Sequence, residues 1–153
     1  MYTLVSALNY VGLHRKGEIS LERIIDDIKT LPVYREAGAL ASFVGVVRED
    51  PVKGSDSKVT HLEYEAYTDV ALQRMQSIRA EAKKRNGILE VAIHHVIDLL
   101  RVGEPSIFVV VLGKHRQEVF PVLAETVDRV KKEVPIWKKE HTSKESYWVS
   151  TES

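Results

Sequence analysis

Five basic side chains in this sequence stand where the chain is expected to turn or to change from one element to the next. Arg48 closes an apolar stretch, His115 and Arg116 precede a long helical pattern, and Lys131 and Lys138 stand near the end of that pattern. Guanidinium groups bind phosphate through paired hydrogen bonds, and histidine or lysine transfers protons when its surroundings tune its pKa. Together these residues predict a pocket for an anionic ligand, without identifying the ligand.

Lys131 lies at the margin of the apolar side of a helix that we expect over residues 117–134. At about 100° per residue, the predicted buried stripe of this helix consists of Val119, Phe120, Leu123, Thr126, Val127, Val130 and Val134. Lys132 points nearly opposite to this stripe. Partial desolvation of an ammonium group lowers its pKa, which suits acid–base chemistry. The alternative is that Lys131 reaches solvent along its aliphatic stem, and periodicity alone favours that alternative.

The second lysine, Lys138, follows a proline that should end the helix. If the chain reverses at Pro135, Lys138 approaches Lys131, and two neighbouring ammonium groups lower each other's pKa and attract anions. The alternative is a solvent-exposed basic turn in which Trp137 anchors the chain in the core. Residues 135–140 on their own favour this simpler interpretation.

The other three basic residues lie beside expected turns. His115 and Arg116 precede the last helix, and free N–H groups at a helix N-terminus favour anions. Their alternative role is capping at the surface. Arg48 comes before residues 49–58, a polar, turn-rich segment that we expect to be a mobile loop that orders over bound substrate. The alternative for Arg48 is a surface salt bridge.

Metal and thiol chemistry find little support in the residue types. His94 and His95 are adjacent on a predicted strand, so they should face opposite sides, and no third ligand stands at suitable spacing. We therefore expect no metal site and no cofactor. The sequence contains 0 cysteines, which excludes disulfides, thiolate ligands and cysteine nucleophiles within this chain. Glycine-rich phosphate loops and the G-x-S-x-G and H-E-x-x-H patterns are also absent from the sequence.

Composition limits the class of protein further. The chain has 153 residues, which suits a single domain, and is 44% hydrophobic and 29% charged. Its 22 basic and 22 acidic residues give a net charge of +0, which argues against bulk electrostatic binding to nucleic acid or membrane. No apolar run approaches the roughly 20 residues of a membrane span, and no signal-peptide pattern is evident at the start. We expect a cytoplasmic protein.

Periodicity predicts the elements that must position these side chains. One helix should begin after Ser20 and end before Pro32, and a second should span residues 69–86. Residues 38–47 are apolar on both alternating faces, which predicts a buried strand. Further strands are expected at residues 2–10, 59–67, 88–100, 106–113 and 146–150. This mixed order predicts an α+β fold, a single domain of long helices packed on a largely antiparallel sheet.

Six segments taken together resemble the large subunit of molybdopterin synthase. They are GALASFVGVVRED, HLEYEAY, AIHHVIDLLRVGEPSIFVVV, KHRQEVF, VKKEVPIWKKE and SYWV. Their order and approximate spacing are those of the family, and the motifs F-x-G-x-V-R, L-E-Y-E-A-Y and P-I-W-K-K-E are specific in combination. The similarity covers roughly residues 17–150, and residues 1–16 match less clearly. It implies a single large-subunit domain over residues 1–153 with the family's α/β hammerhead-like fold.

The resemblance also implies a function. The family's enzyme is a heterotetramer in which two large subunits form a central dimer and one small ubiquitin-like subunit docks at each end. The small subunit carries sulfur as a thiocarboxylate on its C-terminal glycine. Two sulfur transfers convert cyclic pyranopterin monophosphate into the dithiolene of molybdopterin, a step of molybdenum cofactor biosynthesis. The absence of cysteine agrees with this sulfurtransferase activity, because the sulfur comes from the partner.

The family's functional residues match six positions of this chain. The two lysines match the family's catalytic lysines, one four positions before the proline and the other directly after the tryptophan. The arginine that ends the apolar strand and the histidine–arginine pair match substrate-binding residues, and that pair reaches the pocket of the other large subunit. The phenylalanine matches an aromatic residue of the channel for the partner's tail. These positions are Phe43, Arg48, His115, Arg116, Lys131 and Lys138.

Two other classes of function are compatible with the sequence. One is a non-catalytic module of the same fold that binds a pterin or the partner, and the presence of both Lys131 and Lys138 argues against it. The other is an interaction subunit or a nucleic-acid binder that uses the basic stretch at residues 129–144. That stretch also contains Glu133 and Glu140, and the chain is neutral. We rank this class last.

Overall fold

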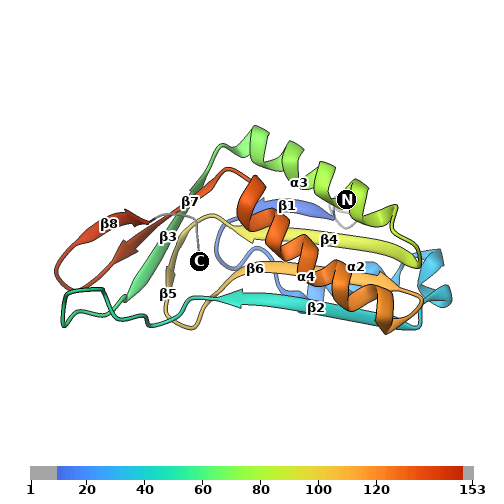
Figure 1. Cartoon of the computed structure of the whole chain (residues 1–153), viewed down its shortest axis with the longest axis horizontal. Helices are drawn as coiled ribbons and strands as arrows, with labels where there is room; N and C mark the ends of the chain where they lie inside the picture. Colours follow the sequence, from blue (N-terminus) through green and yellow to red (C-terminus); the bar gives the residue numbers. More distant parts are fainter. Residues whose placement is uncertain (1–9, 150–153) are drawn as a thin grey trace.

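Two four-stranded sheets form the framework of the protein (Figure 1). The computed structural model describes residues 10–149. The first sheet has the order β1 (Val11–His14), β4 (Ile88–Val96), β6 (Pro105–Gly113) and β2 (Ala39–Val46). The second has the order β5 (Leu99–Arg101), β3 (His61–Ala66), β7 (Ile136–His141) and β8 (Ser146–Val149). Only β1 and β4 pair in parallel among these strands, so the expected, largely antiparallel α+β fold is confirmed.

Helices cover both faces of the first sheet. The helices α3 (Thr68–Lys83) and α4 (Arg116–Glu133) lie side by side over one face (Figure 1). The shorter α2 (Leu21–Lys29) packs on the opposite face and is followed by the 3₁₀ helix η1 (Pro32–Glu36). The hydroxyl oxygen of Ser20 accepts a hydrogen bond from the backbone N–H of Arg23 at 3.2 Å, which confirms the predicted N-cap of α2.

The apolar core is divided into two layers by the strands β4 and β6. Successive side chains of a strand point to opposite faces of its sheet. Val91, Ile93 and Val109 point towards α3 and α4, whereas Ala92 and Val110 point towards α2, and all five are 0% exposed. Burial on both faces explains why these two strands read as continuous apolar runs in the sequence.

The strand β2 is where the expected strand lies, but the prediction that it is buried was wrong. β2 is an edge strand that pairs only with β6 among the described residues, and most of its residues are only partly buried. Val46 at its end is 58% exposed. An apolar run predicts burial only when the sheet continues on both sides, which the sequence does not reveal.

Two other segments differ from the expectation, and a third lies almost wholly outside residues 10–149. Residues 88–100 form not one strand but two, and β4 and β5 join different sheets. Residues 136–141, for which a basic turn was the simpler interpretation, form the strand β7. The expected strand at 2–10 falls almost wholly outside the described residues.

The segment after Arg48 is more ordered than its polar composition predicts. Pro51 and Lys58 form an isolated β-bridge across it. The N–H of Val59 donates to the carbonyl of Asp50 at 2.9 Å, and the side chain of Val59 is buried. Residues 49–58 therefore form a short hairpin-like projection, anchored at both ends.

The buried stripe of α4 is displaced from its predicted position. Phe120 is 61% exposed, so its predicted burial was wrong, and Val122 is 2% exposed in its place. The stripe is centred on Val119, Thr126 and Val130, and at about 100° per residue Phe120 stands to one side of it.

No helix among residues 10–149 is long and apolar enough to cross a membrane.

The double-sided burial of the central strands predicts a sharp difference between two identical substitutions. Val109→Ala removes two methyl groups from a site that is 0% exposed, and should lower the free energy of unfolding by about 2–3 kcal/mol. Val70→Ala, on α3 at a site that is 56% exposed, should change it by about 0.5 kcal/mol or less. Chemical denaturation followed by circular dichroism measures both values, and equal losses would contradict this description of the core.

Candidate active site

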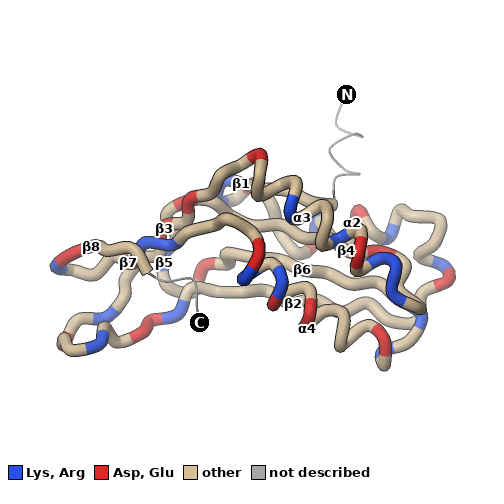
Figure 2. The backbone as a smooth tube through the Cα atoms, turned by 45° about the horizontal axis from the view of Figure 1, so that its top comes forward, with Lys and Arg blue, Asp and Glu red and all other residues tan. Residues whose placement is uncertain are grey.

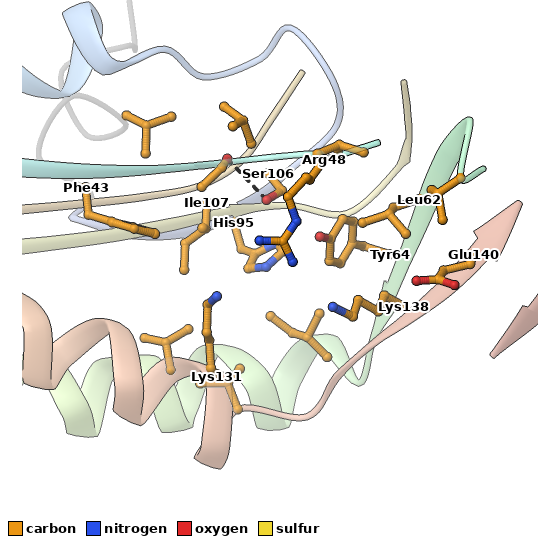
Figure 3. Close-up of a pocket in the computed structure, with 18 of the residues that line it drawn as sticks. Phe43, Arg48, Leu62, Tyr64, His95, Ser106, Ile107, Lys131, Lys138 and Glu140 are labelled. Atoms are coloured by element: carbon orange, nitrogen blue, oxygen red, sulfur yellow. Dashed lines mark hydrogen bonds between the residues drawn. The ribbon is translucent and has the colours of Figure 1, made fainter. Parts of the chain in front are cut away.

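A cavity of about 600 Å³ lies where the two sheets and the end of α4 meet (Figure 3). Its walls come from the end of β2 and the residues after it, from β3 and β7, from the last turn of α4, and from the facing ends of β4 and β6. The polar and charged residues that line it are Arg48, Asp50, Tyr64, His95, Ser106, Lys131, Lys138 and Glu140. Apolar side chains, Phe43 and Ile107 among them, fill the spaces between these groups.

The two lysines meet because the chain reverses at Pro135. A proline disfavours helical geometry in the residue before it, and Val134 accordingly has extended backbone angles, φ −85° and ψ 129°. The helix therefore ends at Glu133, two residues after Lys131, and β7 begins directly after the proline. The side chains of Lys131 and Lys138 both point into the cavity (Figure 3), as the reversal predicted from the sequence requires.

One face of the second sheet supplies a polar wall. Lys138 on β7 lies opposite Tyr64 on β3, and Glu140 lies opposite Leu62. Residues directly opposite each other, and residues two positions apart on one strand, share a face of the sheet. All four side chains therefore line the same side of the cavity.

The floor of the cavity is a row across three strands of the first sheet. His95 on β4 lies opposite Ile107 on β6, which lies opposite Gly45 on β2. A Cβ atom at Gly45 would stand 2.5 Å from Cγ2 of Ile107, so a larger residue here would displace the floor. The ring Nδ1 of His95 donates to the carbonyl of Val96 at 2.9 Å, and burial lowers the pKa of His95 to about 4.

Lys138 lies close to two other cationic side chains, Lys131 and Arg48. This half-buried lysine has a lowered pKa, chiefly because burial disfavours its charged form and then because Lys131 is close by. Arg48 adds to this depression, and Glu140 opposes it. An anion entering the cavity would meet three cationic side chains.

The two carboxylates near the mouth of the cavity already have partners. Nε of Arg48 donates to Oδ1 of Asp50 at 2.7 Å. The hydroxyl of Tyr147 donates to the carboxylate of Glu140, and this hydrogen bond raises the pKa of Tyr147 to about 12. These pairings leave the ammonium groups of the two lysines as the main charges facing the interior.

This arrangement suits reactions in which negative charge develops on oxygen. Fixed cationic donors in a site partly shielded from water stabilise an oxyanion more strongly than water does. A lysine whose pKa is lowered is also neutral more often at a given pH, which allows it to act as a general base or, when protonated, as a general acid. The geometry supports anion binding and proton transfer at one place.

The cavity brings together four of the six predicted site residues. Phe43, Arg48, Lys131 and Lys138 all line it. Two alternatives considered from the sequence hold in part, since Arg48 does form a surface ion pair and Lys131 is largely exposed.

His115 and Arg116 lie elsewhere in the same chain. They are exposed at the start of α4, and His115 makes a 2.7 Å contact from Nδ1 to Glu118. Fifteen residues separate Arg116 from Lys131, which corresponds to about 22 Å along a helix. One chain alone does not bring this pair to the cavity, and its role across a dimer interface stays a prediction.

Five polar residues of the cavity were not singled out as site residues from the sequence. They are Asp50, Tyr64, His95, Ser106 and Glu140. For the four that lie on strands, alternation predicts the face of the residue's own strand, but not which face of another sheet stands opposite. His95 carries the clearest signal, because it is a polar residue on the same face of β4 as the apolar Val91 and Ile93. As predicted, it faces away from His94, which is hydrogen-bonded to His14 at 2.8 Å on the other side of the sheet.

Residues 10–149 contain no group of three or more histidine, aspartate or glutamate side chains placed to hold a metal ion.

Comparison with known proteins shows which family this chain is similar to. A sequence model of the MoaE protein family matches residues 14–133. A Pyrococcus abyssi protein named "Molybdopterin synthase catalytic subunit" is 41% identical over 139 residues, which cover 88% of this chain and 92% of the relative. A Haloferax volcanii protein named "Probable molybdopterin synthase" is 40% identical over 131 residues, 86% of this chain. The chain spans only half, 50%, of the Haloferax relative's length.

The fold is also similar to solved structures. The crystal structure of molybdopterin synthase from Staphylococcus aureus superposes with a TM-score of 0.77 at 29% sequence identity. The superposition covers 90% of this chain and 95% of the Staphylococcus aureus chain.

The proximity of the two lysines predicts a measurable electrostatic coupling. Lys131→Gln removes a positive charge beside Lys138, so the pKa of Lys138 should rise towards its ordinary value. Titration of the lysine Cε signals by NMR measures this change. Lys132→Gln removes the same charge from a residue that does not line the cavity, and it should leave the pKa of Lys138 unchanged. A pKa of Lys138 that is insensitive to Lys131→Gln would show that the two side chains do not meet in solution.

Proposed function

The chain belongs to the MoaE protein family, and on that premise we propose that it is the catalytic large subunit of a molybdopterin synthase. In this proposal it transfers sulfur from the thiocarboxylated C-terminus of a small ubiquitin-like subunit to cyclic pyranopterin monophosphate in the cytoplasm. The observation that carries the proposal is the convergence of Lys131, Lys138 and Arg48 on one cavity. These are positions at which the sequence resembles the family's functional residues.

The substrate's phosphate explains the positive charge of the cavity. Arg48 offers a planar guanidinium that binds phosphate through two parallel hydrogen bonds. Its present partner, Asp50, is held in an exposed ion pair that contributes little stability and is readily exchanged for a stronger ligand. Arg48 therefore holds the substrate near the mouth, and the lysines meet its reacting atoms further inside.

The two lysines divide the work of sulfur transfer between them. The thiocarboxylate sulfur first bonds to a carbon of the substrate, and water then attacks the acyl carbonyl, so that the acyl C–S bond breaks, the sulfur stays on the substrate and the tail leaves as a carboxylate. During the attack by water the carbonyl oxygen acquires negative charge, and an ammonium group fixed nearby stabilises that charge. Lys138, with its lowered pKa, is the better proton carrier. Lys131, on the last turn of α4, supplies the second ammonium group beside the reacting carbonyl.

The partner supplies the sulfur, since the chain itself contains 0 cysteines. A thiocarboxylate at the end of a flexible tail needs an unobstructed channel that leads to the lysines. Phe43 lines the cavity on the side of β2, and Gly45 beside it has no side chain to obstruct such a tail. We place the inserted tail along these residues.

A second copy of this chain completes the site. His115 and Arg116 are exposed cationic or titratable groups about 22 Å from Lys131, too far to act on their own chain's cavity. Phe120, one turn further along α4, is 61% exposed and adds apolar surface to the area that such a contact would cover. A dimer that buries this end of α4 would carry the pair into the neighbouring cavity.

The projection at 49–58 is placed to act as a lid over bound substrate. It begins directly after Arg48, and the ion pair between Arg48 and Asp50 ties it to the mouth of the cavity. Substrate that takes Arg48 away from Asp50 would free the projection to close. Limited proteolysis checks this role, because cleavage within 49–58 should slow when the cyclic pterin phosphate is present, and equal rates would remove the lid from the mechanism.

Nucleic-acid binding through residues 129–144 fits the structure poorly. Arg129 is engaged by Glu133, with Nε donating to Oε2 at 2.6 Å, and it also contacts Glu81. Lys139 lies over the ring of Trp148 at 5.4 Å. Basic and acidic positions are interspersed along the backbone of residues 10–149 (Figure 2), and the net charge of +0 gives no excess of cations for a phosphate backbone.

Product formation from purified components tests the proposed activity. The chain is mixed with a thiocarboxylated small subunit and cyclic pyranopterin monophosphate, and the dithiolene product is quantified. Lys131→Ala should lower the rate by about 100-fold or more, because removal of one oxyanion-stabilising donor commonly has that effect. Lys132→Ala, at the next residue of α4 and outside the lining of the cavity, should retain nearly full activity.

Three outcomes of this assay separate the alternatives. Loss of product with Lys131→Ala, while partner binding is retained, supports the enzyme. An unmodified chain that folds and binds the partner but forms no product is a binding module of the same fold. Equal product from Lys131→Ala and the unmodified chain excludes Lys131 from the mechanism.

A further inference from the structure

His95 is a buried polar residue for which the proposed reaction has so far given no role. It is 7% exposed and lies on β4, at the floor of the cavity and opposite Ile107. The close-up shows it between the two lysines and Tyr64 (Figure 3). A polar ring at the centre of a ligand-sized cavity is a candidate for ligand recognition.

The hydrogen bond of His95 with its own strand fixes which nitrogen carries the proton. Nδ1 lies 2.9 Å from the carbonyl oxygen of Val96, and a carbonyl oxygen can only accept. The proton of the neutral ring is therefore on Nδ1, and Nε2 carries a lone pair. Burial, followed by the nearby charge of Lys131, lowers the pKa of His95 to about 4. Nε2 is thus an acceptor throughout the neutral range.

Nε2 of His95 is open to the cavity. Among the described residues, the only fully buried side-chain nitrogen or oxygen without a hydrogen-bond partner is the hydroxyl of Tyr10. Nε2 makes no hydrogen bond within residues 10–149, so it must retain accessible surface, and His95 borders this cavity. Tyr64 packs against the ring edge-on at 5.0 Å, and its hydroxyl is hydrogen-bonded to Ser106. The hydroxyl of Tyr64 therefore does not occupy Nε2.

The polar groups of the cavity differ in what they can recognise. Arg48 and the two ammonium groups offer only donors, which suit the oxygens of a phosphate. The carboxylates of Asp50 and Glu140 accept from Arg48 and Tyr147 near the mouth. A neutral acceptor on the floor, in contrast, suits a ligand N–H, and a pterin ring carries N–H donors that a phosphate lacks.

We propose that His95 is a specificity residue, whose Nε2 accepts a hydrogen bond from an N–H group of the pterin ring while the cationic side chains hold the phosphate. This inference rests on the proposed function, because it assumes that the ligand is a pterin phosphate. It assigns phosphate affinity and pterin selectivity to different residues of one cavity.

Two substitutions separate recognition through Nε2 from the structural bond to Val96. The amide nitrogen of His95→Asn reaches the position of Nδ1, so this variant keeps the bond to Val96 and loses the acceptor. His95→Gln reaches the position of Nε2 with an amide, so it keeps an acceptor and loses the bond to Val96. A merely structural role for His95 predicts that the Gln variant is the more damaged, and recognition through Nε2 predicts the reverse order.

The test is calorimetric binding at neutral pH with two probes, cyclic pyranopterin monophosphate and inorganic phosphate, using the full chain. His95→Asn should raise the Kd for the pterin probe by about tenfold or more, and should leave the Kd for phosphate within about twofold of that of the unmodified chain. His95→Gln should bind the pterin probe within about threefold of the unmodified chain. Thermal unfolding followed by circular dichroism establishes that each variant is folded.

Several results would overturn the proposal. Unchanged pterin binding by His95→Asn would do so, as would an equal loss of pterin and phosphate binding. If His95→Asn does not fold, His95→Gln decides alone, because loss of pterin binding in that folded variant contradicts recognition through Nε2 and retention supports it. An unmodified chain that does not bind the pterin probe removes the proposed function as well, whereas normal binding by both the unmodified chain and His95→Asn removes only this inference.

Discussion

Pro135 cannot donate a backbone hydrogen bond, and it forces Val134 out of helical geometry, so α4 ends at Glu133, two residues after Lys131. The chain then enters β7 at once, and pairing with β3 fixes the register of that strand. Lys138 is thereby placed opposite Tyr64 and across the cavity from Lys131. The site is held by a helix end and a strand register, both of which are rigid, whereas its mouth is formed by the projection after Arg48.

The convergence of basic residues has an energetic cost that a binding site can accept. Burial and the neighbouring cations Lys131 and Arg48 all disfavour the charged form of Lys138. Glu140, also on β7, opposes this effect only in part. Such arrangements reduce stability and are concentrated at functional sites. The apolar layers of β4 and β6, covered by helices on both faces, provide the stability against which this cost is set. An anionic ligand would relieve the repulsion, so occupancy and local stability should rise together.

Much of this architecture follows from local sequence patterns. Helical periodicity and the Ser20 cap predict α2, and the apolar run of β6 predicts a central strand. The wrong predictions concern features that depend on segments distant in the sequence. Sheet pairing sets the edge position of β2 and separates β4 from β5. The strand β7 was not predicted, because a polar segment after a proline resembles a turn until β3 is placed beside it. Likewise, alternation separates His95 from His94, but only the assembled sheets show that His95 faces the lysines.

The central claim is that sulfur reaches the substrate in the cavity between Lys131 and Lys138. The most direct test is a crystal structure of this chain in complex with the small subunit, whose C-terminal glycine marks the place of the thiocarboxylate. The claim predicts that the terminal carboxylate lies within hydrogen-bonding distance, about 2.7–3.2 Å, of Nζ of at least one of the two lysines, with the tail running past Phe43. A well-ordered tail that ends outside this cavity would contradict it.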